Sequence, residues 1–282
     1  MAPDFRKEMT YKLLAIDIDG TLHTSSREIP HLIPPFLKEL EGRGVTVMLC
    51  TGRRYRTALP IHESLSLSGP MGLHSGALVI NPSTGERLFA QYLEAGAARR
   101  ACAIMRDSGL QPLVWEDNYP DPPDIIASAE YGGFTKEYLG RHEDFVMCVA
   151  DPSSFDSPRI AEVGAWSGFD ELNSVSETIV KELGDSVRVH IAKDIIGDYG
   201  ILEVMSPRAG KWNAVQHLAR MGGIAREEIV AVGDNYNDIE LVGNAGFGVA
   251  MGNAVEAVKE VAAHVTSSND EEGLYNALKK AF

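Results

Sequence analysis

Two aspartates follow directly on a short apolar run near the start of the chain, in the stretch K-L-L-A-I-D-I-D-G-T-L at residues 12–22. The run Leu13–Ile16 predicts a buried strand, and Asp17 and Asp19 come at its carboxyl end, just before a glycine. Open α/β sheets bind ligands beyond the carboxyl ends of their strands. Two neighbouring carboxylates repel each other, and a bound cation relieves that repulsion. The stretch therefore predicts a cation site on an α/β sheet, with a solvated acidic turn as the alternative.

A second polar turn, Thr51-Gly52-Arg53, follows the apolar run at residues 45–49. A turn from a strand into a helix presents free backbone N–H groups and the positive end of the helix dipole, which together attract phosphate. Gly52 would permit a close approach, and the Thr51 hydroxyl would add a donor. The alternative is an ordinary strand-to-helix connection in which Arg53 forms a surface ion pair.

Acidic and amide side chains gather again after the apolar run at residues 229–232, in the segment G-D-N-Y-N-D at residues 233–238. A helix start needs one such residue as a cap, so this excess indicates a binding role. Lys211 follows Gly210 where a helical pattern begins. A cation at that place opposes the helix dipole unless an anion lies near it, so Lys211 is a candidate site residue. The alternative is a solvated surface lysine.

Strand and helix patterns alternate over the first ~80 residues and again from Lys211 onward, as they do around a parallel sheet. Between about residues 94 and 204 the pattern changes to one of strands and helices without regular alternation. The strands expected there cover residues 111–115, 145–150, 187–192 and 200–204, and the helices cover residues 97–108 and 170–183. The sequence thus predicts an α/β core, split along the chain, with a smaller α+β unit inserted in it.

Four short motifs of this chain resemble those of the haloacid dehalogenase-like phosphohydrolases and occur in the same order: D-I-D-G-T-L at residues 17–22, T-G-R at residues 51–53, Lys211, and G-D-N-Y-N-D at residues 233–238. The long insertion between the second and third motifs resembles the cap of the Cof-type branch. This resemblance implies a Rossmann-like parallel-sheet core at residues 1–83 and 206–282, with an inserted α+β cap domain at residues 84–205. It also implies a magnesium-dependent phosphomonoesterase. Cof-type caps close over the core site, which implies that the substrate is a small phosphate ester, such as a sugar phosphate.

The resemblance also implies a role for each matching residue. Asp17 would be the nucleophile that forms an aspartyl phosphate, and Asp19 would act as general acid and then as general base. The implied residues for phosphate or substrate binding are Gly20, Thr51, Gly52, Arg53, Lys211 and Asn237. Those implied for Mg²⁺ are Asp17, Asp19 through its backbone carbonyl, Asp234 and Asp238.

Two positions depart from the pattern of many relatives. The third expected strand is followed by Ser75-Gly76-Ala77, preceded by His74, where relatives often carry Asn-Gly-Ala. Trp212 stands where a glycine often follows the lysine. A serine hydroxyl offers fewer hydrogen bonds than an amide, so the role of Ser75 is open.

Composition narrows the partners. The net charge of −14 disfavours nonspecific binding to nucleic acid or to an anionic membrane, and no apolar run is long enough to span a bilayer. The three cysteines are far apart, and Cys50 and Cys148 lie in apolar runs, so we expect both in the core of a protein from a reducing compartment. The N-terminus carries the charged residues Asp4, Arg6, Lys7 and Glu8 and has no apolar stretch, unlike a signal peptide. We therefore expect a cytoplasmic protein, of a subunit number that the sequence leaves open.

Two other functions remain open at this stage. A sugar phosphomutase would use a related core but return the phosphoryl group to the substrate. A phosphate-responsive regulator without turnover would keep the pocket; Asp17 and Asp19 argue against it, because binding alone needs neither a nucleophile nor an acid.

Overall fold

The structure, a computed structural model, describes residues 11–193 and 199–282. Contacts divide the chain into two compact units, one formed by Met1–Phe89 and Gly210–Phe282 and the other by Ala90–Ala209. The N-terminal residues whose charges argued above against a signal peptide, Asp4, Arg6, Lys7 and Glu8, lie outside the described residues. No helix in the described ranges is both long enough and apolar enough to cross a membrane.

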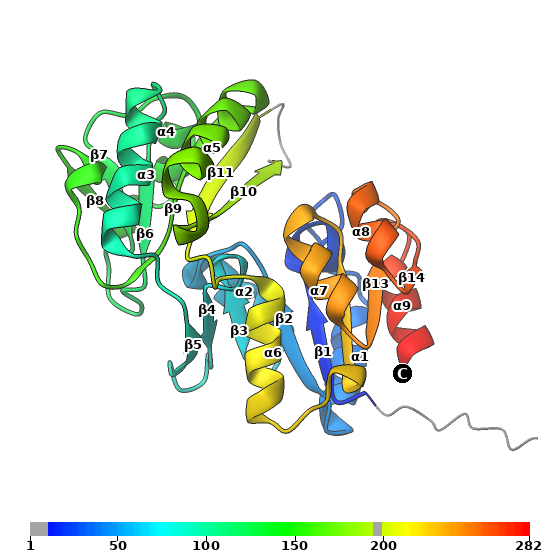
Figure 1. The fold of residues 1–282 in the computed structure, drawn as a ribbon. Helices are drawn as coiled ribbons and strands as arrows, with labels where there is room; N and C mark the ends of the chain where they lie inside the picture. The colour runs from blue at the N-terminus through cyan, green and yellow to red at the C-terminus, as the bar shows by residue number, and fades with distance from the viewer. Residues whose placement is uncertain (1–10, 194–198) are drawn as a thin grey trace, which may run out of the picture. The chain divides into compact units, whose positions relative to one another are not determined.

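The first unit contains a mostly parallel sheet of eight strands with β1 near its middle, in the order β14-β13-β12-β1-β2-β3-β4-β5 (Figure 1). The strands are β1 Leu13–Ile16, β2 Thr46–Cys50, β3 Met71–Leu73, β4 Leu78–Ile80, β5 Arg87–Ala90, β12 Ile229–Gly233, β13 Phe247–Ala250 and β14 His264–Val265. The helices are α1 Ile33–Gly42, α2 Tyr55–Ser64, α6 Lys211–Met221, α7 Ile239–Asn244, α8 Glu256–Val261 and α9 Gly273–Ala281.

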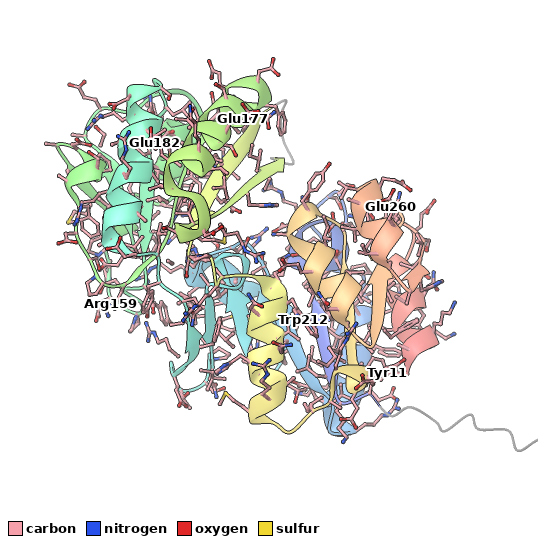
Figure 2. All side chains as sticks on the ribbon, in the orientation of Figure 1. Tyr11, Arg159, Glu177, Glu182, Trp212 and Glu260 are labelled. Carbon is pink, nitrogen blue, oxygen red and sulfur yellow. The ribbon has the colours of Figure 1, made fainter. Side chains whose placement is uncertain are left out.

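All four residues of β1 are fully buried, which shows that both faces of this strand are covered. Leu13 and Ala15 pack with Trp212 and Val215 of α6, whereas the alternating Leu14 and Ile16 point to the opposite face. Trp212 is labelled on α6 in Figure 2, and it is 8 % exposed. The departure from glycine at this position thus adds an aromatic side chain to the core.

The second unit contains a mainly antiparallel sheet of six strands, in the order β10-β11-β9-β6-β7-β8, in which only β7 and β8 pair in parallel among the described pairs. The strands are β6 Leu113–Glu116, β7 Ile125–Ser128, β8 Val146–Val149, β9 Ile160–Gly168, β10 Arg188–Lys193 and β11 Tyr199–Met205. The helices are α3 Ala95–Asp107, α4 Gly133–Gly140 and α5 Phe169–Leu183.

Helices lie on both faces of this second sheet. Residues of α3 and α5 such as Ala101 and Ile179 pack on one face, and Leu139 of α4 packs with Trp115 on the other. Two acidic residues of α5 are labelled in Figure 2: Glu177 is exposed, and Glu182 pairs with Arg100 of α3. The α/β core and the inserted α+β unit agree with the predicted fold class.

The division of the chain falls a few residues later than the expected domain boundaries. The chain passes from the first unit to the second after residue 89, rather than after residue 83, because β5 lies beside β4 in the core sheet. The second change comes after residue 209, immediately before α6. That the two units act as separate domains stays a prediction.

The sequence did not predict three elements of the inserted unit, namely β7, β9 and α4. The nine-residue β9 carries two glycines and is buried along most of its length, so it lacks the alternation of a surface strand. One prediction about the cysteines is wrong: Cys50 is buried, but Cys148 is exposed. Cys148 lies on the edge strand β8, and its neighbours Met147 and Val149 face the core instead.

Candidate active site

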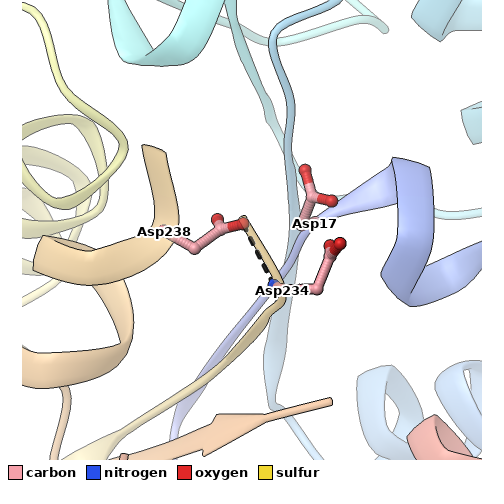
Figure 3. Close-up of side chains that lie close together, drawn as sticks. All are labelled: Asp17, Asp234 and Asp238. Carbon is pink, nitrogen blue, oxygen red and sulfur yellow. Dashed lines mark hydrogen bonds between the residues drawn. The ribbon is translucent and has the colours of Figure 1, made fainter. Parts of the chain in front are cut away.

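The polar segments meet because their strands are neighbours in the core sheet. Strand β1 pairs in parallel with β12, with Ile16 opposite Val232, so the two strands end side by side. Asp17 follows one of these strands and Asp234 follows the other. One carboxylate oxygen from each of Asp17, Asp234 and Asp238 lies within 4.8 Å of the others, and Figure 3 shows the three side chains together.

Lys211 is inserted into this cluster. Its Nζ lies 2.6 Å from Oδ1 of Asp17 and 2.8 Å from Oδ1 of Asp238, and the residue is only 2 % exposed. Burial lowers the pKa of the Lys211 ammonium, but the charges and hydrogen bonds of the two carboxylates outweigh burial and raise it. Lys211 is therefore a buried cation and not a solvated surface lysine.

Asp238 organises the turn that follows β12. Its Oδ2 accepts hydrogen bonds from the backbone N–H groups of Asp234, at 3.2 Å, and Asn235, at 3.1 Å; Figure 3 draws the first. Both of its oxygens thus accept from protein donors, since Oδ1 accepts from Lys211. The helix-capping alternative is also present here, because this turn begins with a capping box formed by Asn235 and Asp238.

The cluster carries excess negative charge. Three carboxylates and one ammonium leave a formal charge of −2 when all four groups are ionised. Burial raises the pKa of Asp17 well above its usual range; Lys211 opposes this, and the neighbouring carboxylates add to it. Burial and then Asp238 raise the pKa of Asp234 to about 7, against the hydrogen bond from Thr21. A divalent cation would cancel this charge, and carboxylate oxygens are the ligands that Mg²⁺ and Ca²⁺ take.

Asp19 pairs with Arg53. Arg53 donates two hydrogen bonds of 2.6 Å to it, from Nε to Oδ2 and from Nη2 to Oδ1. Burial raises the pKa of Asp19, but the hydrogen bonds and charge of Arg53 outweigh burial, so its pKa is lowered. Arg53 therefore pairs within the core with the expected general acid. To donate a proton to a substrate, Asp19 would have to give up this ion pair.

Thr51 and Gly52 lie where the phosphate turn was expected, between β2 and α2. Thr51 is 1 % exposed, and its Oγ1 accepts a hydrogen bond of 3.1 Å from the backbone N–H of Arg53. The hydroxyl thus holds the turn at the start of α2. Asn237 lies on the turn after β12, where its Nδ2 donates to Oγ of Ser75 at 3.2 Å.

Comparison with known proteins decides the family. The profile of the haloacid dehalogenase-like hydrolases matches residues 14–278, which is nearly the whole chain. The chain belongs to the haloacid dehalogenase-like hydrolase family. The predicted superfamily and its Cof-type branch are thereby confirmed.

Relatives match this hydrolase over nearly its full length. Phosphatase YwpJ of Bacillus subtilis is 31% identical, and the match covers 95% of this chain and 99% of that protein. The 5-amino-6-(5-phospho-D-ribitylamino)uracil phosphatase YitU of the same organism is 25% identical, with 96% of this chain and 97% of that protein covered. A solved haloacid dehalogenase-like hydrolase from Bacteroides thetaiotaomicron has a TM-score of 0.82 at 25% identity, covering 97% of this chain and all of the other.

Two contributors to the site of this hydrolase were missed. Thr21 donates from Oγ1 to Oδ1 of Asp234 at 2.9 Å, and Ser75 contacts Asn237. Thr21 had a signal in the sequence, because it directly follows the two aspartates and Gly20. Ser75 had none beyond its departure from the usual pattern, because its contact joins residues 162 positions apart.

Gly20 gives the first testable prediction. Its φ is +84°, and a Cβ at this position would lie 2.3 Å from Oδ2 of Asp234. We expect Gly20→Ala to displace Asp234 and to lower phosphate-ester turnover by at least about tenfold, in addition to a backbone cost of about 1–2 kcal/mol. Steady-state kinetics and thermal unfolding measure the two effects.

Gly44→Ala is the matched control, because Gly44 has a φ of +85° and a Cβ added there would meet nothing within 4 Å. It should show the backbone cost while keeping turnover. Equal turnover in the two variants would contradict the role given to the close approach of Gly20 and Asp234.

Proposed function

We propose that this hydrolase is a Mg²⁺-dependent phosphatase of small phosphorylated metabolites, including sugar phosphates, that works through an aspartyl phosphate on Asp17. The observation that carries the proposal is the burial of Lys211 between Asp17 and Asp238, beside a cluster with a formal charge of −2. Such a cluster suits a cation and the anionic oxygens of a phosphoryl group together. The names of YwpJ and YitU as phosphatases support the reaction type.

The proposed reaction has two steps. A carboxylate oxygen of Asp17 bonds to phosphorus while the ester P–O bond breaks, and Asp19 gives a proton to the departing oxygen. Water then attacks the aspartyl phosphate and returns a proton to Asp19, and the bond from phosphorus to Asp17 breaks to release inorganic phosphate. Lys211 balances the negative charge near Asp17 between the two steps. Arg53 releases its hydrogen bonds to Asp19 when Asp19 takes part in proton transfer and forms them again afterwards.

Asp17 and Asp234, with the backbone carbonyl of Asp19, would hold the metal ion, which supplies positive charge to the phosphoryl oxygens when bound. Asp238 would act through its bonds to Lys211 and to the backbone at Asp234, because both of its oxygens are already engaged. Asn237, Thr51 and Gly52 would contact the phosphoryl oxygens.

Release of inorganic phosphate from a panel of sugar and small-acid phosphates tests the reaction. We expect turnover of hexose, pentose or triose phosphates and none of a folded phosphoprotein. Formation of a phosphate isomer without release of inorganic phosphate would instead support the phosphomutase alternative. Turnover of a phosphoprotein with none of any small ester would contradict the proposed substrate class.

Removal of the metal ion gives the second prediction. EDTA should abolish turnover, Mg²⁺ should restore it, and Ca²⁺ should support little, because Ca²⁺ takes a larger and looser oxygen shell. Asp234→Asn should raise the Mg²⁺ concentration for half-maximal activity by at least about tenfold. Asp185→Asn, at an exposed aspartate of the second unit, is the control and should leave that concentration unchanged. Full turnover in chelated protein would contradict the metal requirement.

A further inference from the structure

The turn His74-Ser75-Gly76 after β3 has an unusual backbone. All three residues have positive φ, at 48°, 50° and 90°, and the first two are not glycine. His74 and Ser75 are 5 % and 3 % exposed. The left-handed region disfavours L side chains, so surrounding contacts must hold this conformation, and such strained turns cluster at functional sites.

The contacts that hold the turn come from the site itself. The backbone N–H of His74 donates to the carbonyl of Arg53 at 3.1 Å, and that of Ser75 donates to the carbonyl of Thr51 at 3.0 Å. A Cβ at Gly76 would lie 2.3 Å from the Gly210 backbone and 2.5 Å from the Lys211 nitrogen. The turn thus joins the loop after β2 to the start of the helix that carries Lys211.

The side chain of Ser75 meets the amide of Asn237. In this arrangement Nδ2 of Asn237 donates to Oγ of Ser75 at 3.2 Å, while the buried Oδ1 has no hydrogen-bond partner among the described residues. A hydroxyl can either donate or accept. A half-turn about χ2 of Asn237 would let Oδ1 accept from the Ser75 hydroxyl and would free Nδ2.

A free Nδ2 is the end of the amide that a phosphate needs, because ionised phosphoryl oxygens only accept hydrogen bonds. The half-turn therefore satisfies the buried Oδ1 and supplies a donor to the ligand at once. Without a ligand, either orientation leaves one end of the amide unpaired, and a hydroxyl that can donate or accept permits both. A bound phosphoryl oxygen that accepts from Nδ2 favours the orientation in which the Ser75 hydroxyl donates to Oδ1, because every polar group is then paired.

We propose that Ser75 is a positioning residue that orients the amide of Asn237 toward phosphate, and that the strained turn exists to bring its hydroxyl there. The proposal rests on the proposed function, in which Asn237 contacts the phosphoryl group. It adds a residue that acts through another side chain and does not itself touch the substrate.

Ser75→Gly separates the hydroxyl from the backbone strain. Glycine adopts a φ of 50° freely, so the variant should unfold at the wild-type temperature or above it. It should nevertheless bind inorganic phosphate, titrated calorimetrically with Mg²⁺ present, about tenfold more weakly. The KM for a phosphate ester should rise while the Mg²⁺ concentration for half-maximal activity stays unchanged, which a general loss of structure would not produce.

Ser66→Gly is the matched control. Ser66 also has positive φ, at 53°, but it is exposed after the end of α2. It should gain stability in the same way and keep the wild-type phosphate affinity. Wild-type phosphate affinity in Ser75→Gly would overturn the proposal.

A double-mutant cycle gives an independent measure. Asn237→Ala should weaken phosphate binding, and adding Ser75→Gly should weaken it no further, because the hydroxyl acts through the amide. Two effects that multiply would overturn the proposal. Phosphate binding that depends on Ser75 in a protein without ester turnover would reject the proposed function alone, whereas turnover that is indifferent to Ser75 would reject the positioning role alone.

Discussion

Asp17→Asn is expected to lower phosphate-ester turnover by about 10⁴-fold or more, because an amide cannot form the aspartyl phosphate. The replacement has nearly the same shape, and its amide oxygen can still accept the hydrogen bond that Lys211 donates over 2.6 Å. It also removes one charge from a cluster with a formal charge of −2. The metal-free variant should therefore unfold at no lower temperature than the wild type.

Two measurements check this expectation. Inorganic phosphate release gives the turnover, and a mass shift in acid-quenched wild-type protein, absent from Asp17→Asn, reports the covalent intermediate. Asp185→Asn is a suitable control, since Asp185 is an exposed aspartate of the second unit. Substantial turnover by a folded Asp17→Asn protein would contradict the covalent mechanism.

Lys211→Met should have the second-largest effect. Methionine has a similar length but no charge, so Asp17 and Asp238 would lose the cation that lies 2.6 and 2.8 Å from them. Removing one partner of a buried ion pair costs about 3–5 kcal/mol of unfolding free energy. The loss of charge stabilisation at the phosphoryl group should also lower turnover by about 10²–10³-fold.

Adding Mg²⁺ tests whether the stability lost in Lys211→Met is due to the missing charge. A bound cation should offset part of the lost charge, so Mg²⁺ should raise the unfolding temperature of the variant more than that of the wild type. Lys279→Met, at an exposed lysine of α9, should leave both turnover and the effect of Mg²⁺ on the unfolding temperature as they are in the wild type. Wild-type turnover in Lys211→Met would show that the buried ammonium has no part in the chemistry.

The sequence alone predicted the core elements well, because their signals are local. The strand Leu13–Ile16 was expected at its observed bounds, and an uninterrupted apolar run of this kind needs only a sheet covered on both sides. The inserted unit was harder to predict. Its strand β9 carries glycines and buried residues on both faces, so neither alternation nor an apolar run marks it.

The sequence also singled out every carboxylate of the cluster and Lys211 as candidates, because each lies in a turn just after a strand or at the start of a helix. The strand order was beyond its reach. That β12 lies beside β1, and that Thr21 therefore meets Asp234 across 213 residues, depends on long-range pairing. Local patterns cannot encode which of several apolar strands become neighbours.

The tertiary structure decided the state of each side chain. Lys211 could have been a solvated lysine, but helix α6 buries it between two carboxylates. Arg53 was open to several partners, and the structure pairs it with Asp19. The contact of Ser75 with Asn237 had no signal in the sequence. The sequence by itself thus determined the family, the core strands and the chemical groups at the site. Only the fold decided their partners and charge environment, because burial and distance are properties of packed atoms and not of residue order.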